Sequence, residues 1–265
     1  MIAGPAAFEP AAELQRAAEL LLKYWTLAIP TAVASLLFGV IVIFSVISVV
    51  ASVFLGHATG GQVGTGLGLG AGILVGLGLV FVGSVALYVG QAMVMAAAPA
   101  VLEDRQPDLS ESVAVTFRRL PDLTVAMVLT FALAVIPIVL SFVLIGLPLL
   151  LLLGYFLMYV PAAVIVGNES GVAAIQTSFR ITTQRVSESV IGWLGLVAAL
   201  VAGSIANSIL IHIPIINLIA AFAVGGFTSA YSALISVRFY LALRDAGPPA
   251  RLPPPAYGGP PAVIR

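Results

Sequence analysis

The sequence predicts an all-α membrane protein, a polytopic bundle of six membrane-spanning helices. Hydrophobic residues make up 61% of the chain and charged residues only 8%, whereas soluble domains carry about 25% charged residues. No Asp, Glu, Lys or Arg occurs within 24–102, 123–168 or 189–237. A spanning helix needs about 20 mostly apolar residues, so each of these three stretches has room for two spans and a turn.

Charged residues occur only in the four segments outside these stretches, and their distribution predicts the orientation. With six spans, the two terminal segments and the two internal ones, 103–122 and 169–188, lie on one side of the membrane. Every Lys and Arg is in these segments, so the positive-inside rule makes that side cytoplasmic. We therefore expect a multi-pass protein of the plasma membrane, with both termini cytoplasmic and the lipid bilayer as a partner.

Charge and cysteine content exclude several classes of function. Lys plus Arg number 11 and Asp plus Glu number 11, so the net charge is zero and no nucleic-acid partner is indicated. The chain has no Cys, which excludes disulfides, thiolate metal sites and a Cys nucleophile. His57 and His212 alone make a poor zinc site, which usually has three protein ligands. We expect neither a metal nor a cofactor.

The two internal charged segments are related by a weak repeat, with copies near 99–119 and 161–181. At an offset of 62 residues the matching pairs are Pro99-Ala100 with Pro161-Ala162, and Phe117-Arg118 with Phe179-Arg180. Asp108 is the predicted N-cap of the first copy's helix, with Glu111 three residues later. We interpret each copy as a short amphipathic helix at the membrane interface, followed by a helical hairpin. Extending this unit to the N-terminal helix gives three hairpins, each preceded by an interfacial helix.

The chain divides into three parts. Residues 1–25 are expected to form an N-terminal interfacial helix, 26–245 the six-span membrane domain, and 246–265 a Pro-rich disordered tail. The expected spans are 28–55, a second one that ends at 102, 123–145, 149–166, 190–211 and 215–237. A glycine-rich loop over 56–66 is expected to join the first two spans.

Glycines recur at steps of four in the second span, at Gly68, Gly72 and Gly76, and again at Gly83. Steps of four place residues on one face of a helix, and missing side chains let a neighbouring helix approach closely. The run follows no strand and contains no phosphate-binding glycine fingerprint. We therefore predict that these glycines serve helix packing.

No ionisable residue lies in the middle of any predicted span, although such residues mark most proton relays and ion paths in membranes. The sequence therefore offers no catalytic residue, and we expect a protein that is not an enzyme. Gln91 and Asn207 are polar residues at membrane depth, and interhelical hydrogen bonds account for them. The alternative is that both line a path for a neutral solute.

Phe117, Arg118, Phe179 and Arg180 are the most informative residues of the repeat. In the functional interpretation, each Phe enters the membrane and each Arg meets a lipid phosphate or a protein partner. In the structural interpretation, the same residues hold the hairpins at the correct depth. We favour anchoring, because lipid-recognition clusters usually contain 4–8 Lys or Arg.

The segments from Pro99 to Arg118 and from Pro161 to Arg180 resemble those of uncharacterised six-span prokaryotic membrane proteins. That group is similar to the membrane domain associated with some glycerophosphoryl diester phosphodiesterases. The resemblance covers most of residues 8–243 and implies the six-span fold. This chain has no soluble phosphodiesterase domain, so no catalytic activity is implied.

The sequence as a whole favours a non-enzymatic membrane protein that acts by packing with lipid, with itself or with another membrane protein, in a scaffold or accessory role. A transporter or channel for a neutral or lipid-like solute is the alternative.

Overall fold

A computed structural model describes residues 9–141, 144–210 and 214–245, apart from the side chains of 59–65, 67, 210 and 214–221. The predicted tail at 246–265 lies outside the described residues. All regular secondary structure in the described part is helical. The elements are α1 (Pro10–Lys23), η1 (Trp25–Leu27), α2 (Ala28–Leu102), α3 (Leu109–Arg118), α4 (Leu120–Leu140), α5 (Gly146–Leu157), α6 (Val160–Ile165), α7 (Gly171–Gln184), α8 (Val186–Leu210) and α9 (Pro214–Asp245).

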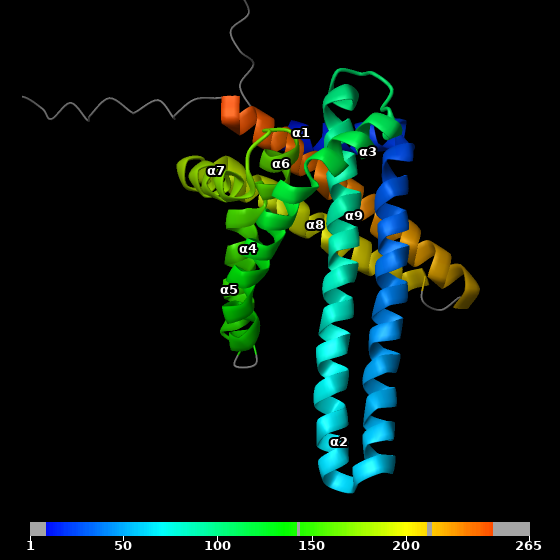
Figure 1. Cartoon of the computed structure of the whole chain (residues 1–265). Coiled ribbons are helices and arrows are strands. Elements are labelled where there is room, and N and C mark those ends of the chain that lie inside the picture. The colour runs from blue at the N-terminus through cyan, green and yellow to red at the C-terminus, as the bar shows by residue number, and fades with distance from the viewer. Residues whose placement is uncertain (1–8, 142–143, 211–213, 246–265) are drawn as a thin grey trace, which may run out of the picture.

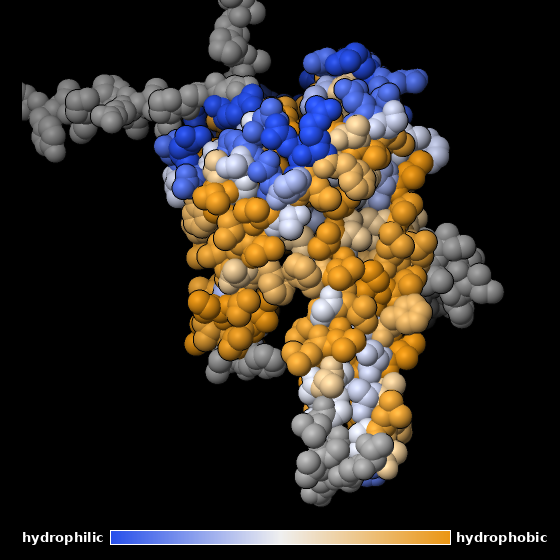
Figure 2. Space-filling model, viewed as in Figure 1, coloured by the Kyte–Doolittle hydropathy of each residue, from blue (hydrophilic) through white to orange (hydrophobic). Residues whose placement is uncertain are grey.

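Five segments among the described residues are long and apolar enough to cross a membrane. They are Trp25–Ala58, Gly68–Leu102, Leu120–Leu140, Gly146–Ile165 and Val186–Ile209. Large hydrophobic side chains are exposed along all five, and Figure 2 shows a broad apolar surface below a hydrophilic end. Such a surface is compatible with lipid and not with water. The chain therefore has the helices of a multi-pass membrane protein.

Helix α2 folds back on itself to form two long antiparallel arms (Figure 1). The hydroxyl of Ser45 in the first arm donates to the carbonyl of Gly76 in the second, at 3.0 Å. The predicted loop over 56–66 is wrong, because the backbone stays helical between the arms. The helix continues through this glycine-rich stretch despite the weak helix propensity of glycine.

The fourth predicted span is interrupted between α5 and α6, next to Pro161. Proline has no N–H, so the regular hydrogen-bond ladder cannot continue past it. Ser178 of α7 fills the gap, since its hydroxyl donates to the carbonyl of Phe156 at 2.6 Å and accepts from the N–H of Tyr159 at 3.3 Å. A side chain of one helix thus satisfies the broken backbone of another, as Ser and Thr often do in membrane proteins.

Several other predicted boundaries also differ from the observed ones. Helix α4 begins three residues earlier than expected, because Pro121 suits the first turn of a helix. It ends at Leu140 rather than at 145, and Leu144 then adopts a left-handed conformation (φ 62°) in the turn to α5. Helix α8 begins at Val186 rather than at 190.

Helix α9 forms the centre of the packed core. Its last three turns are fully buried at Leu234, Phe239 and Tyr240, and it packs on α1, α2 and α8. Thr31 of α2 donates to the carbonyl of Gly226 at 2.8 Å. Neighbouring helices cover much of α9, so it can be less apolar than the long helices α2, α4 and α8.

Candidate interfacial site at the charged end

The four charged segments of the sequence meet at one end of the bundle (Figure 2). Arg238 near the end of α9 donates to Glu13 of α1, between Nε and Oε2 at 2.5 Å. The Arg238 side chain is only 9% exposed and that of Glu13 24%, so this pair is shielded and ties the two terminal segments together. The hydroxyl of Tyr240 donates to Glu169, before α7, at 3.3 Å.

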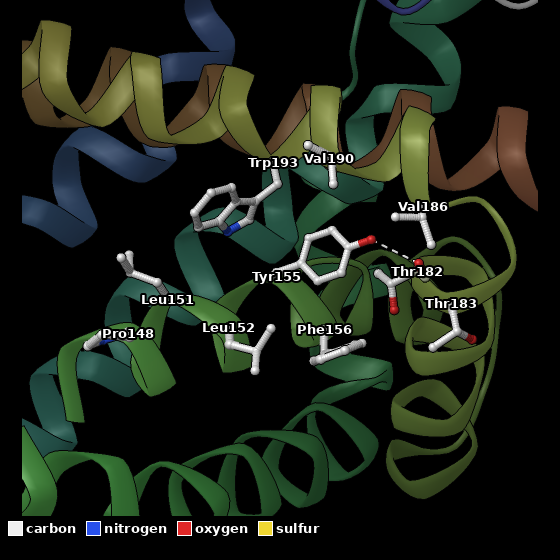
Figure 3. A pocket seen from close by; sticks show the side chains of 10 residues that line it. All are labelled: Pro148, Leu151, Leu152, Tyr155, Phe156, Thr182, Thr183, Val186, Val190 and Trp193. Carbon is white, nitrogen blue, oxygen red and sulfur yellow. Dashed lines mark hydrogen bonds between the residues drawn. The ribbon is translucent and has the colours of Figure 1, made fainter. Parts of the chain in front are cut away.

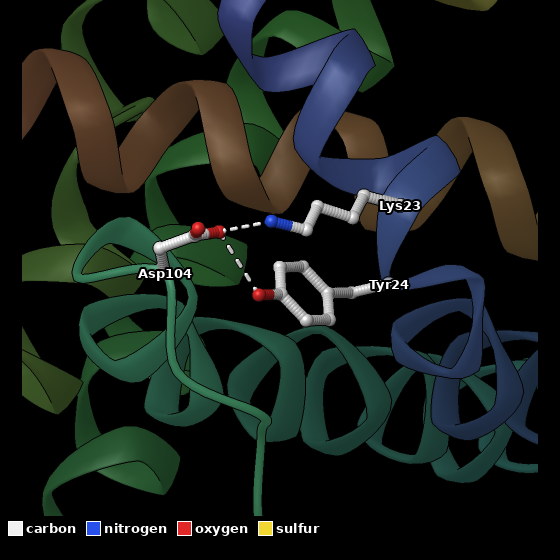
Figure 4. A network of polar contacts seen from close by, with 3 residues as sticks. All are labelled: Lys23, Tyr24 and Asp104. Carbon is white, nitrogen blue, oxygen red and sulfur yellow. Dashed lines mark hydrogen bonds and ion pairs between the residues drawn. The ribbon is translucent and has the colours of Figure 1, made fainter.

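A second ion pair joins the N-terminal segment to the loop after α2 (Figure 4). Lys23 donates to Oδ1 of Asp104 at 2.5 Å, and the hydroxyl of Tyr24 donates to the same oxygen at 3.0 Å. These hydrogen bonds, that of Lys23 first, hold the pKa of Asp104 below its ordinary value, and the bond to Asp104 raises the pKa of Lys23. Both side chains are exposed, so the pair orients the loop more than it stabilises the fold.

A polar cavity of about 690 Å³ lies beside this network. Its lining includes Lys23, Trp25, Asp104 and Gln106, which brings one cation, one carboxylate and an indole ring to the same space. These groups can bind small polar or zwitterionic groups.

Helix α3 lies at this end with its polar side inward. Asp108 caps it as predicted, because its carboxylate accepts from the N–H groups of Ser110 and Glu111. Ser112 and Thr116 are the buried residues of the helix. The apolar face is directed outward instead, and the Phe117 ring is 57% exposed.

Helix α7, which carries the second Phe-Arg pair of the predicted repeat, is arranged differently from α3. Its buried face includes Ala174, Ser178 and Ile181. The Phe179 ring stacks on Phe156 of α5, with ring centroids 4.9 Å apart.

The two Phe-Arg pairs are therefore not equivalent, and they lie on separate parts of the charged end (Figure 1). Phe117 is directed away from the protein, whereas Phe179 packs inward because α5 and α6 lie against α7. Arg118 and Arg180 are both exposed.

The glycines of the second arm lie against the first arm. A Cβ atom at Gly76 would lie 2.9 Å from the hydroxyl of Ser45, and one at Gly83 would lie 2.7 Å from the ring of Phe38. At Gly68 and Gly72 the added atom would overlap Ser52. The close approach of the two arms requires the absence of a side chain at these positions.

Gln91 and Asn207 lie on different helices, α2 and α8, and make different contacts. The amide of Gln91 donates to the hydroxyl of Ser229 at 3.0 Å, which joins α2 to α9. The Oδ1 atom of Asn207 is buried and has no partner within the described residues. Neither residue lines either of the two cavities described here, and the path for a neutral solute stays a prediction. Ser84 and Ser141 are further polar residues of the apolar stretches, and each bonds to a carbonyl of its own helix.

An apolar groove of about 580 Å³ lies between α5, α7 and α8 (Figure 3). Its walls include Leu151, Leu152, Tyr155, Phe156, Val190 and Trp193, and Thr182 and Thr183 form one edge. The groove cannot be predicted from the sequence, since its walls come from three separate segments. The sequence contains one indication only, which is that Tyr155, Phe156 and Trp193 are aromatic residues of the predicted fourth and fifth spans.

Among the described residues, no group of three or more His, Asp or Glu side chains could hold a metal ion. Comparison of the chain with protein families, with curated proteins and with solved structures found no match. The resemblance to six-span prokaryotic proteins therefore stays a prediction, and the function has to be argued from the geometry of the chain itself.

Proposed function

We propose that this protein is a non-enzymatic, six-span protein of the plasma membrane whose charged end lies in the cytoplasm. It acts by packing with lipid or with a membrane partner at that end. The observation that carries the proposal is the joining of all four charged segments at one end of an otherwise apolar bundle.

The path of α8 and α9 supports the sixth span. Helix α8 starts at the charged end, where the hydroxyl of Tyr159 donates to that of Ser189 at 3.5 Å. Helix α9 ends there, since Arg238 pairs with Glu13 and Tyr231 donates to the carbonyl of Leu14 at 3.0 Å. We therefore propose that α8 and α9 are the fifth and sixth spans, both tilted against the arms of α2 (Figure 1).

The outward face of α3 supports a contact with lipid. Val113 and Phe117 are exposed beside Arg118, an arrangement that places apolar groups in the membrane and a guanidinium at the phosphates. Acidic residues are as numerous as basic ones. A general attraction to anionic lipid, worth about 1 kcal/mol per basic residue near the surface, is therefore largely cancelled. Lipid contact then depends on these particular side chains.

The double substitution Arg118→Ala with Arg180→Ala tests the proposal. The melting temperature of the solubilised protein would be measured with and without added phosphatidylglycerol, next to the fraction of protein inserted in membranes. We expect the gain in melting temperature to fall while insertion is unchanged. Arg105→Ala is the control, because Arg105 is an exposed residue of the same end that pairs with Glu103 and lies outside α3 and α7.

Equal loss of insertion and of the lipid response in the double variant would show that the two arginines are anchors only. An unchanged lipid response would show that they do not contact lipid phosphates at all.

A further inference from the structure

The groove between α5, α7 and α8 is built from apolar and aromatic side chains held in a fixed arrangement. Tyr155 packs edge-on against both Trp193 and Phe156, with ring centroids 6.4 and 5.2 Å apart. Phe156 in turn stacks on Phe179. Rings held on both sides do not collapse into the space between them. The groove is therefore preformed, and its volume is within the range of about 300–1,000 Å³ that is usual for ligand sites.

The hydroxyl groups of the groove are already used. Tyr155 donates to the carbonyl of Thr182 at 2.8 Å, which Figure 3 shows as a dashed line. Thr182 donates to the carbonyl of Ser178 at 2.9 Å, and Thr183 to that of Phe179 at 2.7 Å. A polar solute that entered would lose its hydrogen bonds to water and find no free hydroxyl donor here, and each acceptor left unpaired costs about 1–3 kcal/mol. The groove therefore selects an apolar occupant.

The direction of the groove fits a lipid chain. Pro148 lies at one end of its α5 wall and Phe156 at the other, about 12 Å apart at 1.5 Å per residue. Helix α5 runs roughly along the long axis of the α2 arms, and α7 crosses its upper end at the charged end of the molecule (Figure 1). The groove thus runs from the level of the headgroups into the apolar layer.

Two cationic residues are close in sequence to the lining residues of the upper end, although neither lines the groove itself. Arg180 is exposed on α7, and Arg185 lies in the connection between α7 and α8, beside the lining residues Thr183 and Val186. Arg185 pairs with Glu188 at 3.7 Å. Guanidinium groups above an apolar slot suit an anionic phosphate above an acyl chain.

We infer that this groove binds one acyl chain of a membrane phospholipid, with the phosphate near the α7–α8 connection. The inference rests on the proposed membrane placement but involves different residues from the α3 contact. It assigns the chain a specific lipid position, distinct from the exchanging lipid that surrounds any membrane protein.

The two Trp residues of the chain provide the test. Trp25→Phe leaves Trp193 in the groove as the only tryptophan, and Trp193→Phe leaves Trp25, which is exposed near the charged end. Both variants would be reconstituted in phosphatidylcholine bilayers that contain an increasing fraction of phosphatidylglycerol with brominated acyl chains, which quench Trp on contact; the anionic lipid should be enriched in the groove over the zwitterionic host. We expect the quenching of Trp193 to saturate at a low brominated fraction and, at that fraction, to be several-fold stronger than the quenching of Trp25. The quenching of Trp25 should rise in proportion to the brominated fraction.

A matched pair of substitutions on α8 locates the site. Val190 lines the groove and is 37% exposed, whereas its neighbour Ile191 does not line it and is 39% exposed. In the Trp25→Phe background, Val190→Phe should reduce Trp193 quenching to the proportional level, and Ile191→Phe should leave it saturable. Leu152→Phe fills the groove from the opposite wall and should act as Val190→Phe does.

Proportional quenching of Trp193 in the parent protein would overturn the inference and show surrounding lipid only. Absence of Trp193 quenching in fully brominated bilayers would also overturn it, because another protein segment would then cover the groove. Failure of the membrane placement itself is distinguishable, since Trp25 would then not be quenched either.

Discussion

Ser178 shows how a single hydroxyl holds two helices together in this protein. It bridges the carbonyl of Phe156 and the N–H of Tyr159 at the break that Pro161 causes. The residue is fully buried, and an unpaired backbone group is costly where water is scarce. The aligned residue in the first repeat, Thr116, is equally buried, but no corresponding break occurs in α2. The two copies of the repeat thus use the same position for different purposes.

Ser178→Ala should lower the free energy of unfolding by about 1–2 kcal/mol, because it removes both hydrogen bonds of this hydroxyl. One such bond between membrane helices is worth about 0.6 kcal/mol on average and at most about 1.7. Unfolding in mixed micelles with increasing dodecyl sulfate, followed by circular dichroism, measures the change. Thr124→Ala is the control, since the Thr124 hydroxyl is exposed and bonds only to the carbonyl of Leu120 in its own helix. Equal stability of the two variants would mean that Ser178 does not hold the break.

Asp108 gives the cap of α3 a dependence on pH. Hydrogen bonds from the Ser110 hydroxyl and then from the backbone N–H groups of Ser110 and Glu111 hold the pKa of this carboxyl below its ordinary value. A carboxyl with a lowered pKa stabilises the folded state above its unfolded pKa, about 3.9. That stabilisation is lost as the pH falls through the lower, folded value.

We predict that the melting temperature of the parent protein exceeds that of Asp108→Asn at pH 6, and that the difference shrinks as the pH falls below about 4. Asparagine is also a good cap, so the comparison isolates the ionised form. Taking the difference between the two proteins also removes the pH dependence of the Lys23–Asp104 pair, which both share. A difference that stays constant between pH 6 and pH 3 would contradict this role for the charge.

At the scale of elements, the two arms of α2 are held together by the absence of side chains. Glycines on the inner face bring the arms into backbone contact, as at Gly72, where a Cβ would be 3.0 Å from the Cα of Val49. Other glycines of the same arm have open space around them, as at Gly70, where nothing lies within 4 Å. Only the first kind determines packing.

Gly72→Leu should therefore destabilise the hairpin by about 1–3 kcal/mol, the usual cost of overpacking a close contact. Gly70→Leu, two residues away on the open face, should leave stability unchanged or slightly raised, because leucine is the better helix former. Unfolding with dodecyl sulfate compares the two variants. If Gly70→Leu were as destabilising as Gly72→Leu, the helix itself rather than the contact between the arms would be sensitive to substitution.

The sequence determines some elements of this fold directly and others only through their neighbours. Charge-free stretches and glycine steps are local patterns, so the apolar helices, the Asp108 cap and the tight spacing at Gly76 and Gly83 follow from them. The outward face of α3, the inward stacking of Phe179 and the groove at Trp193 depend on which helices lie next to them. Periodicity shows that a helix has an apolar face, but not whether protein or lipid covers it.

The two arms of α2 are much longer than a membrane requires. Each is 34 or 35 residues long, roughly 50 Å at 1.5 Å per residue, whereas a hydrocarbon layer of about 30 Å needs about 20 residues. Figure 1 shows the arms extending far past α4 and α5 on the side away from the charged end. If the charged end is at the cytoplasmic surface, the glycine-rich tip of α2 emerges on the other side.

Cysteine accessibility tests the six-span arrangement most directly, because the chain has no Cys of its own. Gly66 is a suitable site at the far tip, since a Cβ there meets nothing within 4 Å. Ile145 is an exposed site in the turn before α5, whereas at Gly146 a new side chain would overlap the end of α4. Ser110 and Ser170 are exposed sites in the two internal charged segments.

Each single-Cys variant would be treated in intact cells with a membrane-impermeant maleimide, with and without permeabilisation. We predict labelling of Gly66→Cys and Ile145→Cys from outside, and labelling of Ser110→Cys and Ser170→Cys only after permeabilisation. Labelling of either serine variant in intact cells would contradict the placement of all four charged segments in the cytoplasm, and with it the account of this protein as a six-span bundle with one charged face.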